Sequence, residues 1–222
     1  MAPRRDGKSQ QFPKVPEDIE DEVLEAYAEH TDGGDFHLQT LPNFFRGLGI
    51  PSCYFSDVSE CIEYYYSHVD GRGIDVANHR EWITFQMLVA YTLTTSSNPH
   101  QLLDVVDIDK LIRNTSTLIK FRNNHSHILA SWRLFVDVGS PGADPETFRL
   151  TLPHLQAIKE HMNLDSGSHG PLGDSFLISM LSCCSTKEDG SPTSFYLDKP
   201  KSGTGITIRD FAEILGNLGE LD

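Results

Sequence analysis

Four short polar segments of this chain carry glycines and side-chain oxygens between apolar stretches, and oxygens of this kind could hold a hard cation such as Ca²⁺. The segments are residues 33–36, 70–76, 139–145 and 185–205. A twelve-residue calcium loop presents oxygens at positions 1, 3 and 5, a backbone carbonyl at 7 and a bidentate Glu at 12. Binding of an ion therefore depends on which residues fall at those positions.

Counting through the segments indicates that the acidic ligands are missing. The last ligand position falls on Thr40 in the first segment and on Asn78 in the second. It falls on His154 in the third and on Asp210 in the fourth, where two lysines precede it. Neither Thr nor Asn can replace a bidentate carboxylate, and the lysines oppose a cation. We therefore predict no calcium site, no other metal site and no cofactor.

The apolar residues on both sides of each segment recur at three- and four-residue spacing, which predicts an entering and a leaving helix around each one. The predicted fold is all-α, with four helix–loop–helix units in two lobes. Ile74-Asp75-Val76 resembles the short strand through which paired calcium loops hydrogen-bond to each other, and this resemblance implies very short paired strands between the loops. The predicted divisions are a disordered basic tail at 1–16, a first pair of units at 17–95, a helical linker at 96–126, and a second pair with long loop insertions at 127–222.

The charge of the chain argues against direct binding to nucleic acid or to a membrane. Acidic residues number 32 and basic residues 18, a formal net charge of −14, so the surface repels phosphates and attracts basic partners. No segment is apolar enough to span a bilayer, and no signal peptide is expected. The four cysteines show no CxxC spacing, which favours reduced thiols in an intracellular protein.

The sequence carries no catalytic motif that we can assign. It lacks GxSxG, HExxH and phosphate-loop patterns. Ten histidines are present, but His154 and His161, spaced one heptad apart, have no zinc-ligand pattern beside them. We predict that the protein is not an enzyme; the alternative, an enzyme on an unrecognised helical fold, is motivated by the histidines alone.

Four strings of residues resemble the EF-hand proteins of the calmodulin and centrin superfamily. They are Phe44-Phe45-Arg46-Gly47-Leu48-Gly49, Gly73-Ile74-Asp75-Val76, Trp132-Arg133-Leu134-Phe135 and Ile206-Thr207-Ile208-Arg209-Asp210-Phe211. With its ligand-free loops, long third and fourth connections and acidity, the chain is most similar to the fungal centrin-like proteins that accompany the damage sensor of nucleotide excision repair. That sensor is the counterpart of the xeroderma pigmentosum group C protein.

The resemblance implies a calcium-independent adaptor in the nucleus that binds an amphipathic, basic helix of a larger partner and stabilises that partner. The implied groove lies in the C-terminal lobe, and Trp132 and Met162 are its favoured contacts. Its expected lining is Trp132, Phe135, Leu155, Ile158, Met162, Phe176, Met180, Leu181, Phe211, Ile214 and Leu215. The alternative is a light-chain-like structural protein that clasps an IQ-type helix of a myosin or spindle-pole component through the same groove.

Overall fold

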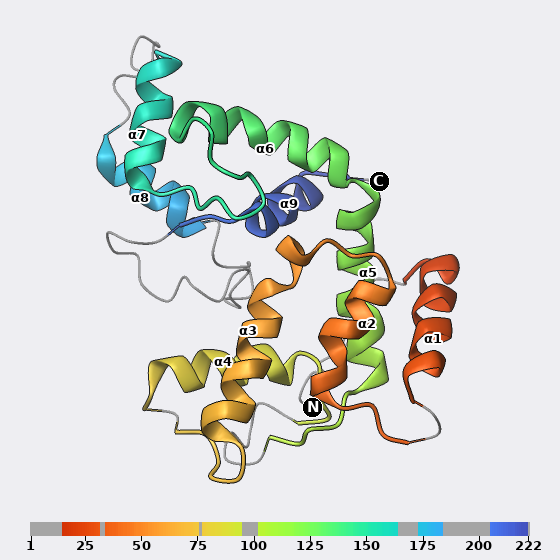
Figure 1. Ribbon diagram of the computed structural model, residues 1–222. Coiled ribbons are helices and arrows are strands. Elements are labelled where there is room, and N and C mark those ends of the chain that lie inside the picture. The colour runs from red at the N-terminus through yellow and green to blue at the C-terminus, as the bar shows by residue number, and fades with distance from the viewer. Residues whose placement is uncertain are drawn as a thin grey trace, which may run out of the picture.

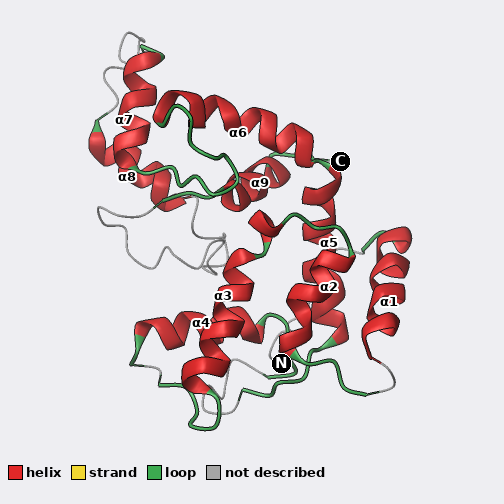
Figure 2. Cartoon of the chain, viewed as in Figure 1, coloured by secondary structure: helices red, strands yellow, loops and turns green. Residues whose placement is uncertain are grey.

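The computed structural model describes residues 15–31, 34–75, 77–94, 102–163, 173–183 and 205–221. Within these residues the chain is helical, with turns and isolated bridges between the helices (Figure 2). The predicted all-α class is confirmed. Among the described helices none is long and apolar enough to cross a membrane. Residues 1–14 of the predicted tail and nearly all of the predicted insertion at 185–205 lie outside the described residues.

The N-terminal half consists of helices wrapped around an aromatic core. Its helices are α1 (Glu17–Thr31), α2 (Leu41–Gly47), α3 (Ser56–Tyr64) and α4 (His79–Val89). The 3-10 turns η1 (Leu38–Thr40) and η2 (Ser52–Tyr54) precede α2 and α3, and the π-helical turn η3 (Tyr65–Val69) extends α3. Acidic residues fill the first turn of α1, where they complement the helix dipole.

Adjacent phenylalanines at the centre of α2 hold this half together. Phe44 and Phe45 are both fully buried. The Phe44 ring meets Phe36 at 5.4 Å, and the Phe45 ring meets Phe55 at 5.3 Å and Tyr91 at 6.0 Å between centroids. Burial of one such side chain contributes about 1.5 to 3 kcal/mol, so these residues anchor α2 to both flanking segments.

Helices α5 (Ile108–Asn123) and α6 (His125–Gly139) meet at the single residue Asn124 and run in different directions (Figure 1). The α5 helix packs against α1, whereas α6 packs against α7 and α9. Arg122 fixes the end of α5 by donating to Glu22 of α1 at 2.5 Å and to the carbonyl of Leu48 at 2.7 Å. The bend therefore passes the chain from the N-terminal half to the C-terminal half.

The C-terminal half contains α6, α7 (Leu152–His161), α8 (Asp174–Cys183) and α9 (Ile208–Asn217). An antiparallel bridge joins Leu150 to Ile206, just before α7 and α9 begin. Each of the two residues donates its backbone N–H to the other's carbonyl at 2.8 Å. The two connections are thus held side by side, and α7 and α9 start from one shared point.

The N-terminal half has a different pairing from the one that the sequence suggested. Val105 bridges to His37, and Val106 bridges to Thr92. Ile74 and Asp75 take part in none of the bridges between described residues. The N–H of Asp75 is donated instead to the Glu81 side chain, at 2.9 Å. Paired strands between the first and second loops are therefore not found in the described part of the chain.

The two halves meet where η2 lies against α9. Tyr54 shares a hydrogen bond with His125 Nδ1 at 2.9 Å. The guanidinium of Arg209 in α9 donates to the Asp57 carboxylate in α3, and both side chains are largely buried. Contacts from α3 and η2 therefore fix the C-terminal helix against the rest of the chain. The predicted division into two pairs of units and a linker remains a prediction.

Candidate functional site

The leaving helices α7 and α9 begin in the same way. Thr207 is the N-cap of α9, and its N–H and hydroxyl both donate to Asp210 Oδ2 at 2.8 Å. Thr151 caps α7, and its N–H donates to His154 Nδ1 at 3.2 Å. These are reciprocal capping boxes. The side chains at the two expected ion-ligand positions therefore cap their own helices.

The start of α4 resembles these two but lies in a different register from the count made from the sequence, which placed the last ligand position on Asn78. Asn78 caps α4, and its Oδ1 accepts from the N–H of Arg80 at 3.1 Å and of Glu81 at 3.4 Å. The residue equivalent to His154 and Asp210, three positions after the cap, is therefore Glu81 and not Asn78. The spacing Asn-x-x-Glu is a capping signature that could have revealed this.

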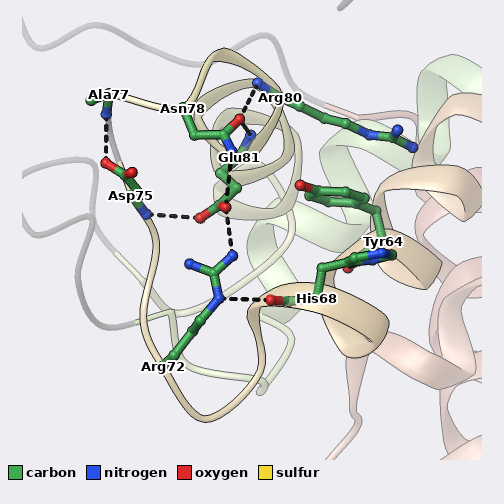
Figure 3. A network of polar contacts seen from close by, with 8 residues as sticks. All are labelled: Tyr64, His68, Arg72, Asp75, Ala77, Asn78, Arg80 and Glu81. Atoms are coloured by element: carbon green, nitrogen blue, oxygen red, sulfur yellow. Dashed lines mark hydrogen bonds and ion pairs between the residues drawn. The ribbon is translucent and has the colours of Figure 1, made fainter.

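Glu81 is a buried carboxylate, 3% exposed, at the centre of a polar network (Figure 3). It accepts from Arg72 Nη2 at 2.5 Å, from the N–H of Asp75 at 2.9 Å and from Asn78 Nδ2 at 3.2 Å. The hydrogen bond from Arg72 and then that from Asp75 lower the pKa of Glu81. The carboxylate therefore remains ionised inside the fold, with a guanidinium as its counter-charge.

Among the described residues no three His, Cys, Asp or Glu side chains gather as a metal site would require. Arg80 points away from the carboxylate of Glu81 and lies over the Tyr64 ring, 4.2 Å from its centroid (Figure 3). Calcium independence remains a prediction.

The predicted groove residues differ in exposure. Those buried in the core are Trp132, Leu155, Ile158 and Leu181. Those of intermediate exposure are Phe135, Phe211, Ile214 and Leu215. The exposed ones are Met162, at 60%, and Met180, at 44%. The Phe176 side chain lies outside the described part of the structure. The expected lining therefore includes a buried layer and a more accessible one.

Trp132 is the base of an aromatic cluster on α6 and α9. Its ring centroid lies 5.3 Å from Phe211 and 6.1 Å from Phe135, and those two rings lie 5.5 Å apart. Its indole N–H donates to the carbonyl of Pro145 at 2.8 Å. Trp132 is thus fully buried in this structure, where it supports the two partly buried phenylalanines and offers no surface itself.

Comparison with known proteins then defines the family. A family model described as Rad33 matches residues 9–167, which is most of the chain. The chain belongs to the Rad33 family. The DNA repair protein RAD33 of Saccharomyces cerevisiae is 27% identical over 214 residues, which cover 94% of this chain and 89% of the yeast protein. No solved structure matches significantly.

The residues matched by the Rad33 model include the Arg72–Glu81 network and the aromatic pair Trp132 and Phe135. Met180 and Phe211 lie beyond the matched residues. The candidate groove of this Rad33-family chain therefore combines elements inside and outside the matched span.

Two exposed apolar residues and one cavity were not predicted from the sequence. Leu134 on α6 and Leu218 after α9 are each 70% exposed. A cavity of about 260 Å³ lies between α5 and α9, with Phe121 and Glu213 in its lining. The buried residues of α6 are Ile128, Trp132 and Val136, four positions apart. Leu134 lies two positions from Trp132 and therefore on the opposite face of the helix.

Proposed function

We propose that this Rad33-family chain is a calcium-independent, centrin-like adaptor in DNA repair, built from degenerate EF-hand units. It binds an amphipathic helix of a larger partner and stabilises that partner. The proposed partner is the damage sensor of nucleotide excision repair, and the proposed location is the nucleus. The yeast relative is a DNA repair protein, which supports this proposed process. We further propose that the chain has no catalytic activity.

The observation that carries this proposal is the bridge between Leu150 and Ile206. It joins the two helix–loop connections of the C-terminal half through a reciprocal pair of backbone hydrogen bonds. Linked loops of this kind are expected of paired EF-hand units, and so are the matching starts of α7 and α9, each capped by a Thr. The bridge thus supports descent from ion-binding pairs even though the ligands are absent.

Such a pair of units is suited to holding an apolar helix. A groove between entering and leaving helices accepts anchors spaced i, i+3, i+4 and i+7. Phe135 and Phe211 present partly exposed rings over Trp132, and Met180 on α8 adds a flexible apolar side chain that adapts to different partners. Each partner side chain buried there contributes about 1.5 to 3 kcal/mol before ordering costs.

The partner helix should carry basic residues outside its apolar face. The chain has a net charge of −14, and opposite charges speed encounter and select among partners. This preference is separate from the apolar contacts, because it weakens as salt increases whereas apolar burial does not.

Affinity purification of the tagged full-length chain followed by mass spectrometry tests the proposal. Met180→Glu introduces a charge on the candidate groove, and Leu134→Glu is the matched control at another exposed apolar site of the same half. We expect the wild type and Leu134→Glu to retain a nucleotide-excision-repair protein and Met180→Glu to lose it. Recovery of a cytoskeletal partner instead would favour the light-chain-like alternative, and equal retention by all three proteins would reject the groove.

A further inference from the structure

The Arg72–Glu81 pair connects the two helices that flank the second loop. Arg72 Nη2 donates to the carboxylate of Glu81 in the first turn of α4, at 2.5 Å. Its Nε donates to the carbonyl of His68 in η3, which extends α3, at 2.7 Å. One guanidinium therefore binds the end of the entering helix and the start of the leaving helix (Figure 3).

A bound cation would make the same connection in an ion-binding loop. Its twelfth residue is a Glu whose carboxylate turns into the loop, and earlier positions supply further oxygens. If Glu81 is counted as the twelfth residue, Asp70 is the first and Arg72 is the third. The third position would normally supply an oxygen to the ion, and here it supplies a positive charge.

We propose that the guanidinium of Arg72 occupies the place of a divalent cation in the loop of residues 70–81, so that the loop carries its own cation. This inference rests on the proposed descent from EF-hand units. It explains why a buried carboxylate persists in a loop whose third and fifth positions, Arg72 and Ile74, offer no acidic ligand. It also identifies a latent cation site that Arg72 keeps closed.

The backbone of the loop turns on both sides of Arg72. Gly71 and Gly73 flank it with φ angles of +82° and +79°, a region that residues with a side chain rarely adopt. The loop also departs from the standard pattern, since Asp75 stands at the sixth position where glycine is usual. The analogy therefore rests on the charge and its two attachments and not on the path of the backbone.

The competing explanation is an ordinary surface ion pair. The Arg72 side chain is 51% exposed, as in many surface pairs, but that of Glu81 is only 3% exposed. Three separate donors converge on the Glu81 carboxylate. A buried carboxylate needs a counter-charge, so removal of Arg72 leaves a site that demands another cation.

Binding of Tb³⁺, a luminescent substitute for Ca²⁺, tests the proposal in the full-length chain. Trp82 follows Glu81 directly in the sequence and can sensitise the emission. The test variant is Arg72→Asp. The matched control is Arg80→Asp, which makes the same charge change beside the same network but leaves Arg72 in place. We expect Arg72→Asp to bind Tb³⁺ at least about tenfold more tightly than Arg80→Asp, with Ca²⁺ competing, and the wild type to match the control.

Further variants make each outcome decisive. Adding Glu81→Gln to Arg72→Asp should abolish the emission, and Arg72→Lys, which retains a cation, should behave like the wild type. If Arg72→Asp unfolds by circular dichroism, recovery of helix on adding Ca²⁺ supports the proposal, and failure to recover overturns it. Equal binding by Arg72→Asp and Arg80→Asp also overturns it, as does wild-type binding that Glu81→Gln removes. Loss of the proposed partner through Met180→Glu leaves this result unchanged, so the two proposals fail separately.

Discussion

Replacement of Asp57 by Ala should weaken the attachment of α9 to the N-terminal half. The side chains of Asp57 and Arg209 are only 12% and 13% exposed, and both carboxylate oxygens of Asp57 accept from the guanidinium. Burial is the largest single influence on the pKa of Arg209 and lowers it, but the electrostatic effects of Asp57, Tyr91 and Glu213, with the hydrogen bond to Asp57, together raise it by more, so Arg209 remains charged. The variant therefore leaves a buried cation without its main partner.

The expected decrease in the free energy of unfolding depends on the lost ion pair and on one carboxylate that remains near Arg209. Removal of one partner of a buried ion pair typically costs about 3 to 5 kcal/mol. The Glu213 carboxylate lies 3.8 Å from Arg209 Nε and retains part of the attraction. We therefore expect a loss of about 3 kcal/mol in the free energy of unfolding, or about 6 to 12 °C in Tm for a chain of this size.

Urea unfolding followed by tryptophan fluorescence measures this effect in each half. Trp82 lies in α4 and Trp132 in α6, so Trp132→Phe and Trp82→Phe backgrounds report the N-terminal and C-terminal halves separately. The two transitions should coincide with Asp57 present and separate in Asp57→Ala. Glu63→Ala, at an exposed position of the same helix, is the control and should change little.

A paired replacement separates the ion pair from simple packing. Asp57→Leu combined with Arg209→Met removes both charges, and such exchanges are often neutral or stabilising. The reasoning is refuted if the double variant loses as much stability as Asp57→Ala, or if Asp57→Ala loses less than about 1 kcal/mol.

Three further predictions concern local interactions. Thr207→Ala removes the cap that faces Asp210 and should cost about 1 kcal/mol in thermal unfolding; unchanged stability would contradict the capping role. Lys110→Met removes three hydrogen bonds from Nζ to backbone carbonyls around the end of α4 and should cost about 2 kcal/mol, with faster amide exchange there. Because folding lowers the pKa of Glu81 below its ordinary value of 4.5, the ionised carboxylate stabilises the fold at pH values above 4.5. This contribution is lost as the pH falls through the folded pKa. Arg72→Ala should therefore flatten the fall in stability below pH 4.5 measured by urea unfolding, and an unchanged slope would exclude the pair as its cause.

Local patterns were sufficient for the parts of the fold that depend on neighbouring residues. Apolar spacing predicted helices around each polar segment. Leu155 and Ile158 lie in α7, and Phe211 and Ile214 lie in α9. Leu150 and Ile206, each four positions before the counted residues His154 and Asp210, form a bridge with each other. The count at the second loop was anchored on Ile74, which makes no bridge among the described residues, and so Glu81 was missed.

Features that depend on distant residues could not be read from the sequence. Trp132 was expected at the surface of the groove, but its burial depends on Phe148 and Phe211, which reach it from other segments. Arg209 and Asp57 lie 152 positions apart, and no periodicity relates them. Side-chain exposure in the groove is likewise decided by how the helices pack.

A change in the angle at Asn124 would move the whole of α6 relative to α5. The α6 helix has 15 residues and is therefore about 22 Å long. A change of about 20° at the bend would move the far end of α6 by about 8 Å and Trp132, near its middle, by about 4 Å. The ion pair between Arg209 of α9 and Asp57 restrains this angle, because α9 packs against α6. Asp57 lies outside the groove and yet helps to set the orientation of the groove.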